Sequence, residues 1–271
     1  MGSGTVTFER DGFFSSQAEG FRLRTREMQP FKVWFDYALG LNRLGYEILR
    51  SWGTLTGRDR IAVNASFVRV HKSFQSVIIL AERGLVSDAR AVLRSAVECA
   101  IAIQALAKDA SFFEQMIEAH HRAERTFARE FAAAPSAEKL AAIADADAYE
   151  ASMGKELRVI HWEQVAKRHC PAPLYRLLYQ VLYRDLSSDG THATINSLNR
   201  LLGVEENGQI TAIKAAPDTN GLVEVLPHAC LVFILSAEVC ANVNGLADVA
   251  TTLDRAVAEF NALDGGGAVA R

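Results

Sequence analysis

Apolar residues along most of the chain recur at the alternating three- and four-residue spacing that buries one face of an α-helix. The clearest stripe lies in residues 58–83. Its members are Val63, Phe67, Val70, Phe74, Val77 and Ala81. Gly84 follows this stripe, as expected for a left-handed cap at a helix end. The pattern predicts a helix that packs in a bundle.

The same spacing predicts helices along nearly the whole chain, about seven to nine in number. They are expected at residues 30–52, 58–83, 87–109, 110–133, 161–169, 173–186, 191–202 and 222–263, with a more exposed, Ala-rich helix within 132–152 that is broken near Pro135. The helix at 87–109 is apolar on nearly every side, so we expect it at the centre of the bundle. The last helix should kink near Pro227 or break near Gly245.

The pattern changes after Gly203, which we expect to end the helix before it. Asn207-Gly208 stands between Val204 and Ile210, and an Asn-Gly pair between apolar segments is typical of a tight β-hairpin. We place this hairpin near residues 204–214. The fold class that follows is all-α, a multi-helix bundle with one minor β-hairpin.

The chain shows no internal repeat and no long linker. We therefore expect a single helical-bundle domain over residues 30–263, preceded by an N-terminal arm at 1–29. The glycine-rich end of the sequence, residues 264–271, is expected to be a disordered tail.

Composition narrows the classes of protein that the sequence can represent. Of 271 residues, 49% are hydrophobic, so a large core can form, and the net charge is −3. Proteins that coat duplex nucleic acid carry a basic field, so any nucleic-acid contact here should be local. The 4 cysteines are widely spaced and form no CxxC pair, which favours reduced thiols in the cytoplasm.

Two further features concern localisation. The N-terminal residues lack the apolar core of a signal peptide. The most apolar segment, residues 222–243, contains Glu224 and Glu238 with Pro227 and His228 between them. A buried core helix is a better interpretation of this segment than a membrane span. We expect a cytoplasmic protein without membrane contact.

Charged residues recur on the central predicted helix. Arg90, Arg94 and Glu98 lie at four-residue spacing among apolar neighbours, so they share one face. Charges in such a helix must pair or face a cavity, because an unpaired buried charge is costly. One interpretation is a structural Arg–Glu pair. The other is a polar pocket that holds an anion.

The preceding helix offers Arg69 and Ser73 next to its apolar stripe. Ser73 lies 11 residues before Gly84 and Arg94 lies 10 residues after it. Two antiparallel helices joined at Gly84 would place these side chains at similar heights. Arg69 and Ser73 could then face Arg94, although a solvated surface position is the alternative.

The stretch YRDLSSDGTH, residues 183–192, joins two predicted helices. Arg184 would end one helix and His192 would begin the next, where free backbone N–H groups bind anions. Arg184 and His192 are therefore candidates for phosphate binding and proton transfer, with Ser187 beside them. The alternative is a simple helix cap made by Ser188, Asp189 or Thr191.

Other catalytic chemistry has little support in the sequence. Glu118 and His121 form one Glu-x-x-His pair, but a di-metal bundle needs two such pairs and further carboxylates. The basic segment HHRAERTFARE, residues 120–130, is interpreted as a solvated helix face. No nucleotide-binding glycine loop or hydrolase serine motif is present. We expect no metal and no cofactor.

Two segments together resemble a known group of proteins. RVHKSFQSVIILAERGLVSDARAVLRSAVECAIAI and LYRDLSSDGTHATINSL resemble an uncharacterised family of bacterial all-helical domains related to the HEPN superfamily (higher eukaryotes and prokaryotes nucleotide-binding). The resemblance covers about residues 55–205 and implies a HEPN-like helical bundle. The motif of HEPN proteins is an Arg, often followed by a polar residue, then four to six residues and a His. Arg184-Asp185 matches the start of this motif, whereas the 7 residues between Arg184 and His192 depart from its spacing.

This resemblance also implies a function. Many HEPN proteins are metal-independent ribonucleases of phage-defence, toxin–antitoxin or RNA-processing systems, often with two motifs meeting across a homodimer. It implies that His192 and Arg184 are catalytic and that Arg94 and Glu98 orient them. Other HEPN branches have lost catalysis. The alternative is therefore a non-catalytic domain that binds a nucleotide, an anion or a partner protein.

Overall fold

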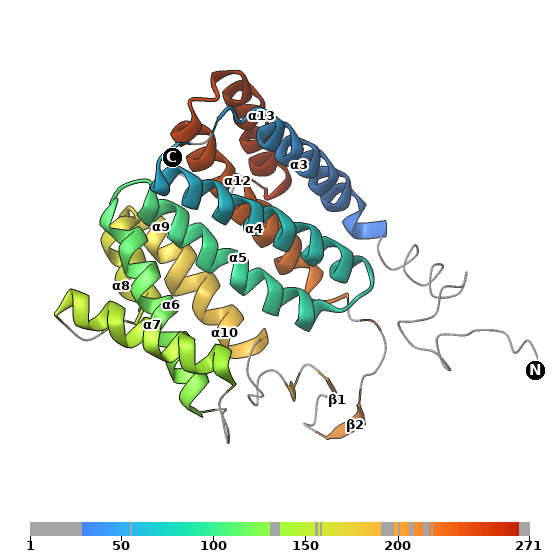
Figure 1. Cartoon of the computed structure of the whole chain (residues 1–271). Helices are drawn as coiled ribbons and strands as arrows, with labels where there is room; N and C mark the ends of the chain where they lie inside the picture. Colours follow the sequence, from blue (N-terminus) through green and yellow to red (C-terminus); the bar gives the residue numbers. More distant parts are fainter. Residues whose placement is uncertain are drawn as a thin grey trace, which may run out of the picture.

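The computed structural model shows an all-α bundle with a small two-stranded sheet at one edge (Figure 1), which confirms the predicted fold class. The structure describes residues 29–54, 56–130, 136–154, 157, 159–190, 198–199, 201–205, 209–213, 217 and 219–265. Nearly all of the predicted N-terminal arm and most of the predicted tail lie outside these residues.

The helices follow the predicted order. Their bounds are η2 (Gln29–Phe31), α3 (Lys32–Arg50), α4 (Arg58–Glu82), α5 (Val86–Leu106), α6 (Ser111–Glu130), α7 (Ala137–Met153), α8 (Trp162–His169), α9 (Ala172–Tyr175), η3 (Arg176–Tyr183), α10 (Arg184–Gly190), α12 (Leu222–Asn244) and α13 (Ala247–Leu263). Helices α9, η3 and α10 follow one another without a break, and η3 is a π-helix. A π-helix of 8 residues is unusual, because π-helical turns are rare. Such turns are frequently found at functional sites.

Helix α5 lies at the centre of the bundle, as its nearly continuous apolar surface predicts. It packs against α4, α12, α10, α8 and η3. Helix α12 meets the length and composition of a membrane-crossing helix, but most of its apolar window is buried in the core. There it packs on α3, α4, α5 and α13. The interpretation of this segment as a core helix is therefore confirmed.

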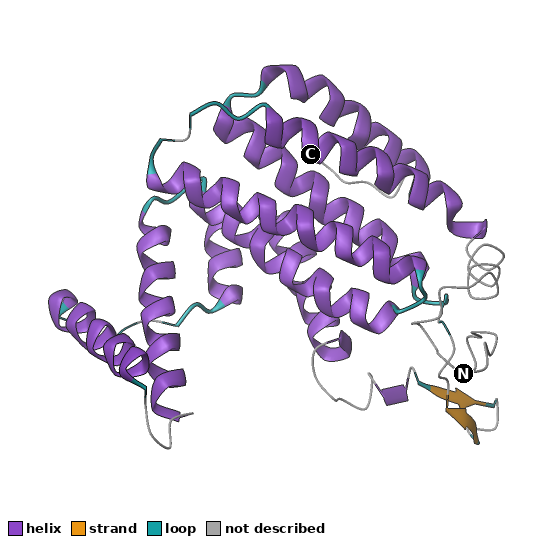
Figure 2. Cartoon of the chain, turned by 45° about the vertical axis from the view of Figure 1, so that its right-hand side comes forward, coloured by secondary structure: helices purple, strands orange, loops and turns teal. Residues whose placement is uncertain are grey.

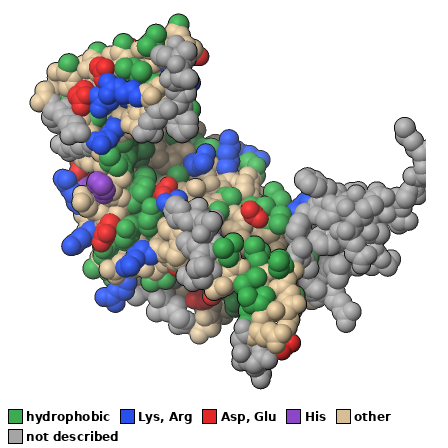
Figure 3. Space-filling view, turned by 90° about the horizontal axis from the view of Figure 1, so that it is seen from below, with side chains coloured by type: hydrophobic (Ala, Val, Ile, Leu, Met, Phe, Trp, Pro, Cys, Tyr) green, Lys and Arg blue, Asp and Glu red, His purple; other side chains and the backbone are tan. Residues whose placement is uncertain are grey.

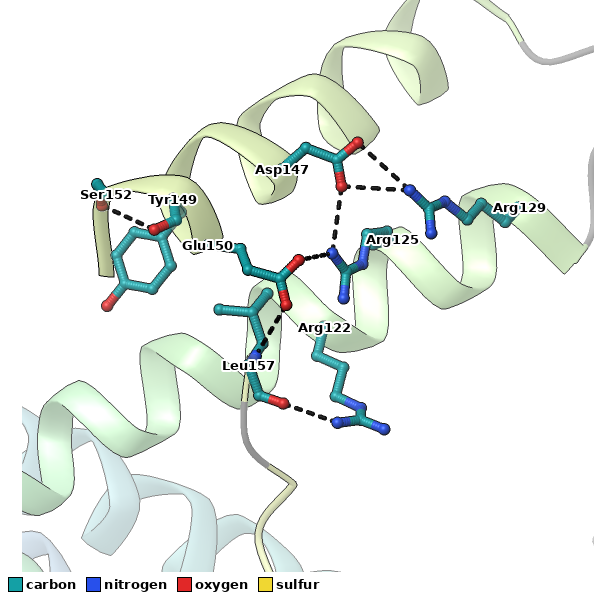
Figure 4. A network of polar contacts seen from close by, with 8 residues as sticks. All are labelled: Arg122, Arg125, Arg129, Asp147, Tyr149, Glu150, Ser152 and Leu157. Atoms are coloured by element: carbon teal, nitrogen blue, oxygen red, sulfur yellow. Dashed lines mark hydrogen bonds and ion pairs between the residues drawn. The ribbon is translucent and has the colours of Figure 1, made fainter. Parts of the chain in front are cut away.

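Helices α6 and α7 form a hairpin that projects from the bundle (Figure 2). Charged residues join the two helices (Figure 4). Arg125 is only 14% exposed and pairs with Glu150 and Asp147, while Arg129 pairs with Asp147. The prediction that this face of α6 is simply solvated is wrong for Arg125, because α7 covers it.

The structure differs from the prediction at two helix ends. The helix expected to stop at residue 186 continues to Gly190. Gly203 does not close a helix but lies in β1 (Leu202–Val204), opposite Ala212 of β2 (Ile210–Ile213). The predicted break near Gly245 is confirmed, because Gly245 has a φ of 65° and forms the left-handed cap that ends α12.

The α3–α4 contact depends on a close approach at Gly45. The His71 ring is buried there, stacks on Phe67 at an interplanar angle of 14°, and has Nε2 2.9 Å from Oδ1 of Asn42. A Cβ at position 45 would lie 2.7 Å from Nε2 of His71. Because the ring is fixed by its neighbours, it cannot move aside without loss of these contacts.

Gly45→Ala should lower the free energy of unfolding by about 1–3 kcal/mol, since the new methyl group overlaps the His71 ring. Gly40→Ala is the matched control in the same helix, because a Cβ there meets nothing within 4 Å. The control should be more stable than the original protein by about 0.5–1 kcal/mol, through helix propensity. Urea unfolding measures both changes. Equal effects of the two substitutions would contradict this account.

Candidate functional site

The four-residue spacing on α5 turns Arg90, Arg94 and Glu98 toward the helix made of η3 and α10. Helix α5 packs against both of these elements, and against α12 near Arg90. The predicted charged face of α5 is therefore a real feature of the fold. Its members have different partners, so each is described separately.

Arg90 is completely buried and joins three helices. Its Nη2 lies 2.5 Å from Oδ2 of Asp185 on α10, and its Nη1 donates to Oε2 of Glu224 on α12 at 3.0 Å. The two carboxylate side chains are 51% and 53% exposed. Burial of the guanidinium is costly, and two charge-assisted hydrogen bonds offset that cost.

Arg94, one turn further along α5, is partly accessible. Its Nε donates to Oγ of Ser187 at 2.8 Å, and its Nη2 donates to the Tyr183 hydroxyl at 2.9 Å. Nη2 also lies 3.1 Å from Oε1 of Glu98, and both side chains are 23% exposed. The guanidinium carbon lies 4.9 Å from the centre of the Tyr183 ring. The predicted Arg94–Glu98 pair is present, and the contact of Ser187 with Arg94 is an addition that the sequence did not predict.

The surroundings of Glu98 affect its ionisation. Burial raises its pKa, and this effect exceeds the opposing effects of the Arg94 charge and of a hydrogen bond from Tyr183. Burial likewise raises the pKa of the neighbouring Cys99 thiol to about 11, although the charge of Arg69 acts in the opposite direction. Arg69, which is exposed on α4, is thus close enough to Cys99 for its charge to act on the thiol.

A row of tyrosines extends this site along α9 and η3. The rings of Tyr175 and Tyr179 are 6.0 Å apart and nearly parallel, and those of Tyr179 and Tyr183 are 5.1 Å apart. Glu163 of α8 accepts hydrogen bonds from the hydroxyls of Tyr175 and Tyr179. The four-residue spacing of these tyrosines is visible in the sequence, but it did not lead us to include them in the predicted site. The signal that could have done so is a tyrosine on every turn of a helix that packs against the charged face of α5.

Arg184 does not occupy the predicted position at a helix end. It is exposed within the continuous helix from Ala172 to Gly190. The hydroxyl of Ser187 donates to the Tyr183 carbonyl, and that of Ser188 donates to the Asp185 carbonyl. The Ser188 hydroxyl thus donates backward along its own helix, and the residues that it would cap as a helix start lie outside the described residues.

Several candidate residues have other outcomes. His192 and Thr191 lie outside the described residues, as does the side chain of Asp189. Ser73 is 6% exposed, and no described contact joins it to Arg94. Residues 206–208, which include the predicted Asn-Gly turn, are also outside the described part, although the strands on both sides form the predicted hairpin.

Within the described residues, no group of three or more His, Cys, Asp or Glu side chains could hold a metal ion. Glu118 is buried, and the ring of His121 stacks on Tyr149 with centres 4.6 Å apart. A hollow of about 310 Å³ lies between α12 and α13 and contains none of the candidate site residues.

Seen from below, the molecule shows basic and acidic side chains intermixed with hydrophobic ones (Figure 3). Among the described residues, no continuous basic field covers this face, in agreement with the net charge of −3. A polyanion that bound to this face would therefore contact a small group of side chains and not a broad electrostatic surface.

These features define a helical-bundle protein with a half-buried arginine, carboxylate and tyrosine site on its central helix. The chain belongs to DUF5677, a family of unknown function, whose model matches residues 60–210. This region contains Arg94, Glu98, Tyr183 and Ser187, whereas Glu224 lies beyond it. No curated protein and no solved structure matches the chain.

Arg90→Ala should lower the free energy of unfolding by about 2–4 kcal/mol, because it removes a fully buried side chain that links three helices. Arg58→Ala is the control, since the Arg58–Glu114 pair is exposed and 3.4 Å long. The control should change stability by less than about 0.5 kcal/mol. Thermal and urea unfolding measure both, and a small effect at Arg90 would show that the link is dispensable.

Proposed function

We propose that this protein is a HEPN-type, metal-independent endoribonuclease of a phage-defence or toxin-type module in the cytoplasm. The observation that supports this proposal most is the tethering of one helix. Tyr183 and Ser187, on either side of Arg184, both bond to Arg94 of the central helix. Asp185 bonds to Arg90. The segment that leads to His192 therefore starts from a firmly held position.

In the proposed reaction, the ribose 2′-oxygen attacks the adjacent phosphorus, and the bond to the 5′-oxygen breaks. His192 takes the proton from the 2′-hydroxyl or donates one to the leaving 5′-oxygen. Arg184 stabilises the negative charge that develops on the phosphorane. The products are a 2′,3′-cyclic phosphate and a free 5′-hydroxyl. Arg94 and Glu98 orient the helix that carries Arg184.

A homodimer belongs to this proposal, because HEPN motifs often meet across a two-fold axis. The substrate would be a locally recognised RNA, such as a tRNA loop. Single-stranded loops expose bases that stack on aromatic side chains, and the Tyr175–Tyr179–Tyr183 row is of that chemical kind. The mildly acidic net charge is also better suited to a small target than to a long duplex.

A second function is favoured by one different observation. The guanidinium of Arg94 contacts the hydroxyls of Ser187 and Tyr183 and the carboxylate of Glu98. These polar groups can bind a ligand, and none of them is needed to cleave it. The protein would then be a non-catalytic domain that binds a nucleotide, an anion or a partner protein. RNA cleavage distinguishes this function from the first.

Incubation with total tRNA in EDTA should give fragments that end in a 2′,3′-cyclic phosphate, detected by mass spectrometry. His192→Ala and Arg184→Ala should reduce the cleavage rate at least about 100-fold, the scale of a lost acid–base or charge-stabilising group. Arg176→Ala removes another exposed arginine from the same helix and should leave the rate unchanged. Equal cleavage by the original protein and His192→Ala, or none by either, would exclude the ribonuclease.

A further inference from the structure

The hollow between α12 and α13 shares no residue with the charged face of α5. Its volume is about 310 Å³, which is at the lower end of the range for small-molecule sites. Its lining extends from Ile234 to Gly245 on α12 and from Leu246 to Val257 on α13. Each of these segments is about 16 Å long, from the rise per residue of an α-helix. The hollow therefore follows the groove between the two helices.

Two carboxylates stand opposite each other in this hollow. Glu238 on α12 lies 7 residues before Gly245, and Asp254 on α13 lies 9 residues after it. The two helices form an antiparallel hairpin around Gly245, so these side chains lie at similar heights along the groove. Glu238 is exposed and has no hydrogen-bond or ion-pair partner among the described residues. At least one of the two negative charges is thus available to a ligand.

The wall between these carboxylates and the joint of the two helices is mostly apolar. It is lined by Ala241, Leu246, Ala250 and Leu253. The two alanines leave space that larger side chains would fill, and Asn242 adds one polar group. The hollow therefore combines a negative end with an apolar end. This combination matches a cation that carries an alkyl chain.

We propose that this hollow binds a small aliphatic amine, with its ammonium group between Glu238 and Asp254 and its alkyl chain against the wall nearer Gly245. The ammonium group donates hydrogen bonds to the carboxylates, and these bonds are strong because both partners are charged. The alkyl chain leaves water for an apolar surface, which adds to the affinity. This site is separate from the ribonuclease proposed above and does not depend on it.

The charges around the hollow favour a cation over an anion. Residues 234–257 carry three acidic side chains and one basic side chain, which are Glu238, Asp248, Asp254 and Arg255. An anion in the groove would be repelled by this excess of negative charge. An aliphatic amine is protonated at neutral pH, because its pKa is close to that of the lysine side chain, about 10.4.

The surface around the hollow is unlike the centre of a protein interface. Interface centres are rich in aromatic and large apolar side chains. Among the described residues, no exposed large hydrophobic side chain lies between residues 224 and 265. The hollow is therefore better suited to a free amine than to a lysine side chain that a partner protein presents.

Hexylamine is the probe for this site, because it carries one ammonium group on an unbranched chain. Calorimetry with the full chain at pH 7 should show that it binds. 1-Hexanol lacks the charge and methylamine lacks the chain, so each should bind at least about tenfold more weakly than hexylamine. Equal binding of 1-hexanol would show that the carboxylates take no part, and would overturn the proposal.

Glu238→Gln keeps the shape of the side chain and removes its charge, so hexylamine should bind about tenfold more weakly. Glu259→Gln is the matched control, because Glu259 is exposed on α13 but does not line the hollow. The control should bind within about twofold of the original protein. An equal loss in both variants would indicate a general effect of charge and contradict the site.

Ala250→Leu tests the apolar part of the site. Ala250 is exposed, so a larger side chain there fills the hollow without entering the core. Hexylamine should bind at least about tenfold more weakly to this variant, because the added methyl groups overlap the alkyl chain. Ala258→Leu is the control on the same helix, since Ala258 is exposed and lies outside the hollow. Unchanged binding in Ala250→Leu would place the amine elsewhere.

A lysine derivative distinguishes a free amine from a partner protein. N-acetyl-lysine methylamide carries the same ammonium group on a peptide unit, and it should bind more weakly than hexylamine. Equal or tighter binding of this derivative would assign the hollow to a partner protein and overturn the free amine. None of these measurements uses RNA, so their outcome is independent of the result of the tRNA cleavage assay.

Discussion

The buried guanidinium of Arg90 is the constraint on which the arrangement of this bundle depends. A charge inside an apolar helix layer must have partners, and Arg90 takes them from α10 and α12, helices far apart in the sequence. Apolar packing alone would tolerate small rotations of those helices, but a planar fork between two carboxylates would not. The central helix, the tethered helix and the core helix are thereby fixed relative to one another.

That constraint also explains the difference between two arginines that look equivalent in the sequence. Arg90 is paired with two carboxylates and is inaccessible to solvent, so its role is structural. Arg94 is partly open, contacts hydroxyls, and shares its single carboxylate with Tyr183. The contacts of Arg90 hold α10 against α5 one turn away from Arg94. They therefore keep the donors around Arg94 in place, as a binding site requires.

Periodicity was sufficient to predict the order of the helices and the central place of α5. The Asn207-Gly208 pair predicted the hairpin, and the break at Gly245 was one of two alternatives for the last helix. Periodicity failed where local chemistry was ambiguous. Ser187, Ser188 and Gly190 resemble a turn, but in α10 the serine hydroxyls bond to carbonyls of the preceding turn and the helix continues. The partners of Arg90 could not be predicted, since pairing between distant helices depends on packing angles that no local pattern encodes.

The π-helix η3 has a consequence for which face of the following helix meets the core. It lies directly before Asp185 and Ser187, the residues that meet Arg90 and Arg94. A π-helical turn holds more residues than an α-helical turn, so the 8 residues of η3 rotate the chain less than 8 α-helical residues would. If the same residues were wound as an α-helix, Asp185 and Ser187 would be turned away from the positions in which they meet α5. The wide turns of η3 thereby decide which side chains of α10 reach the two arginines.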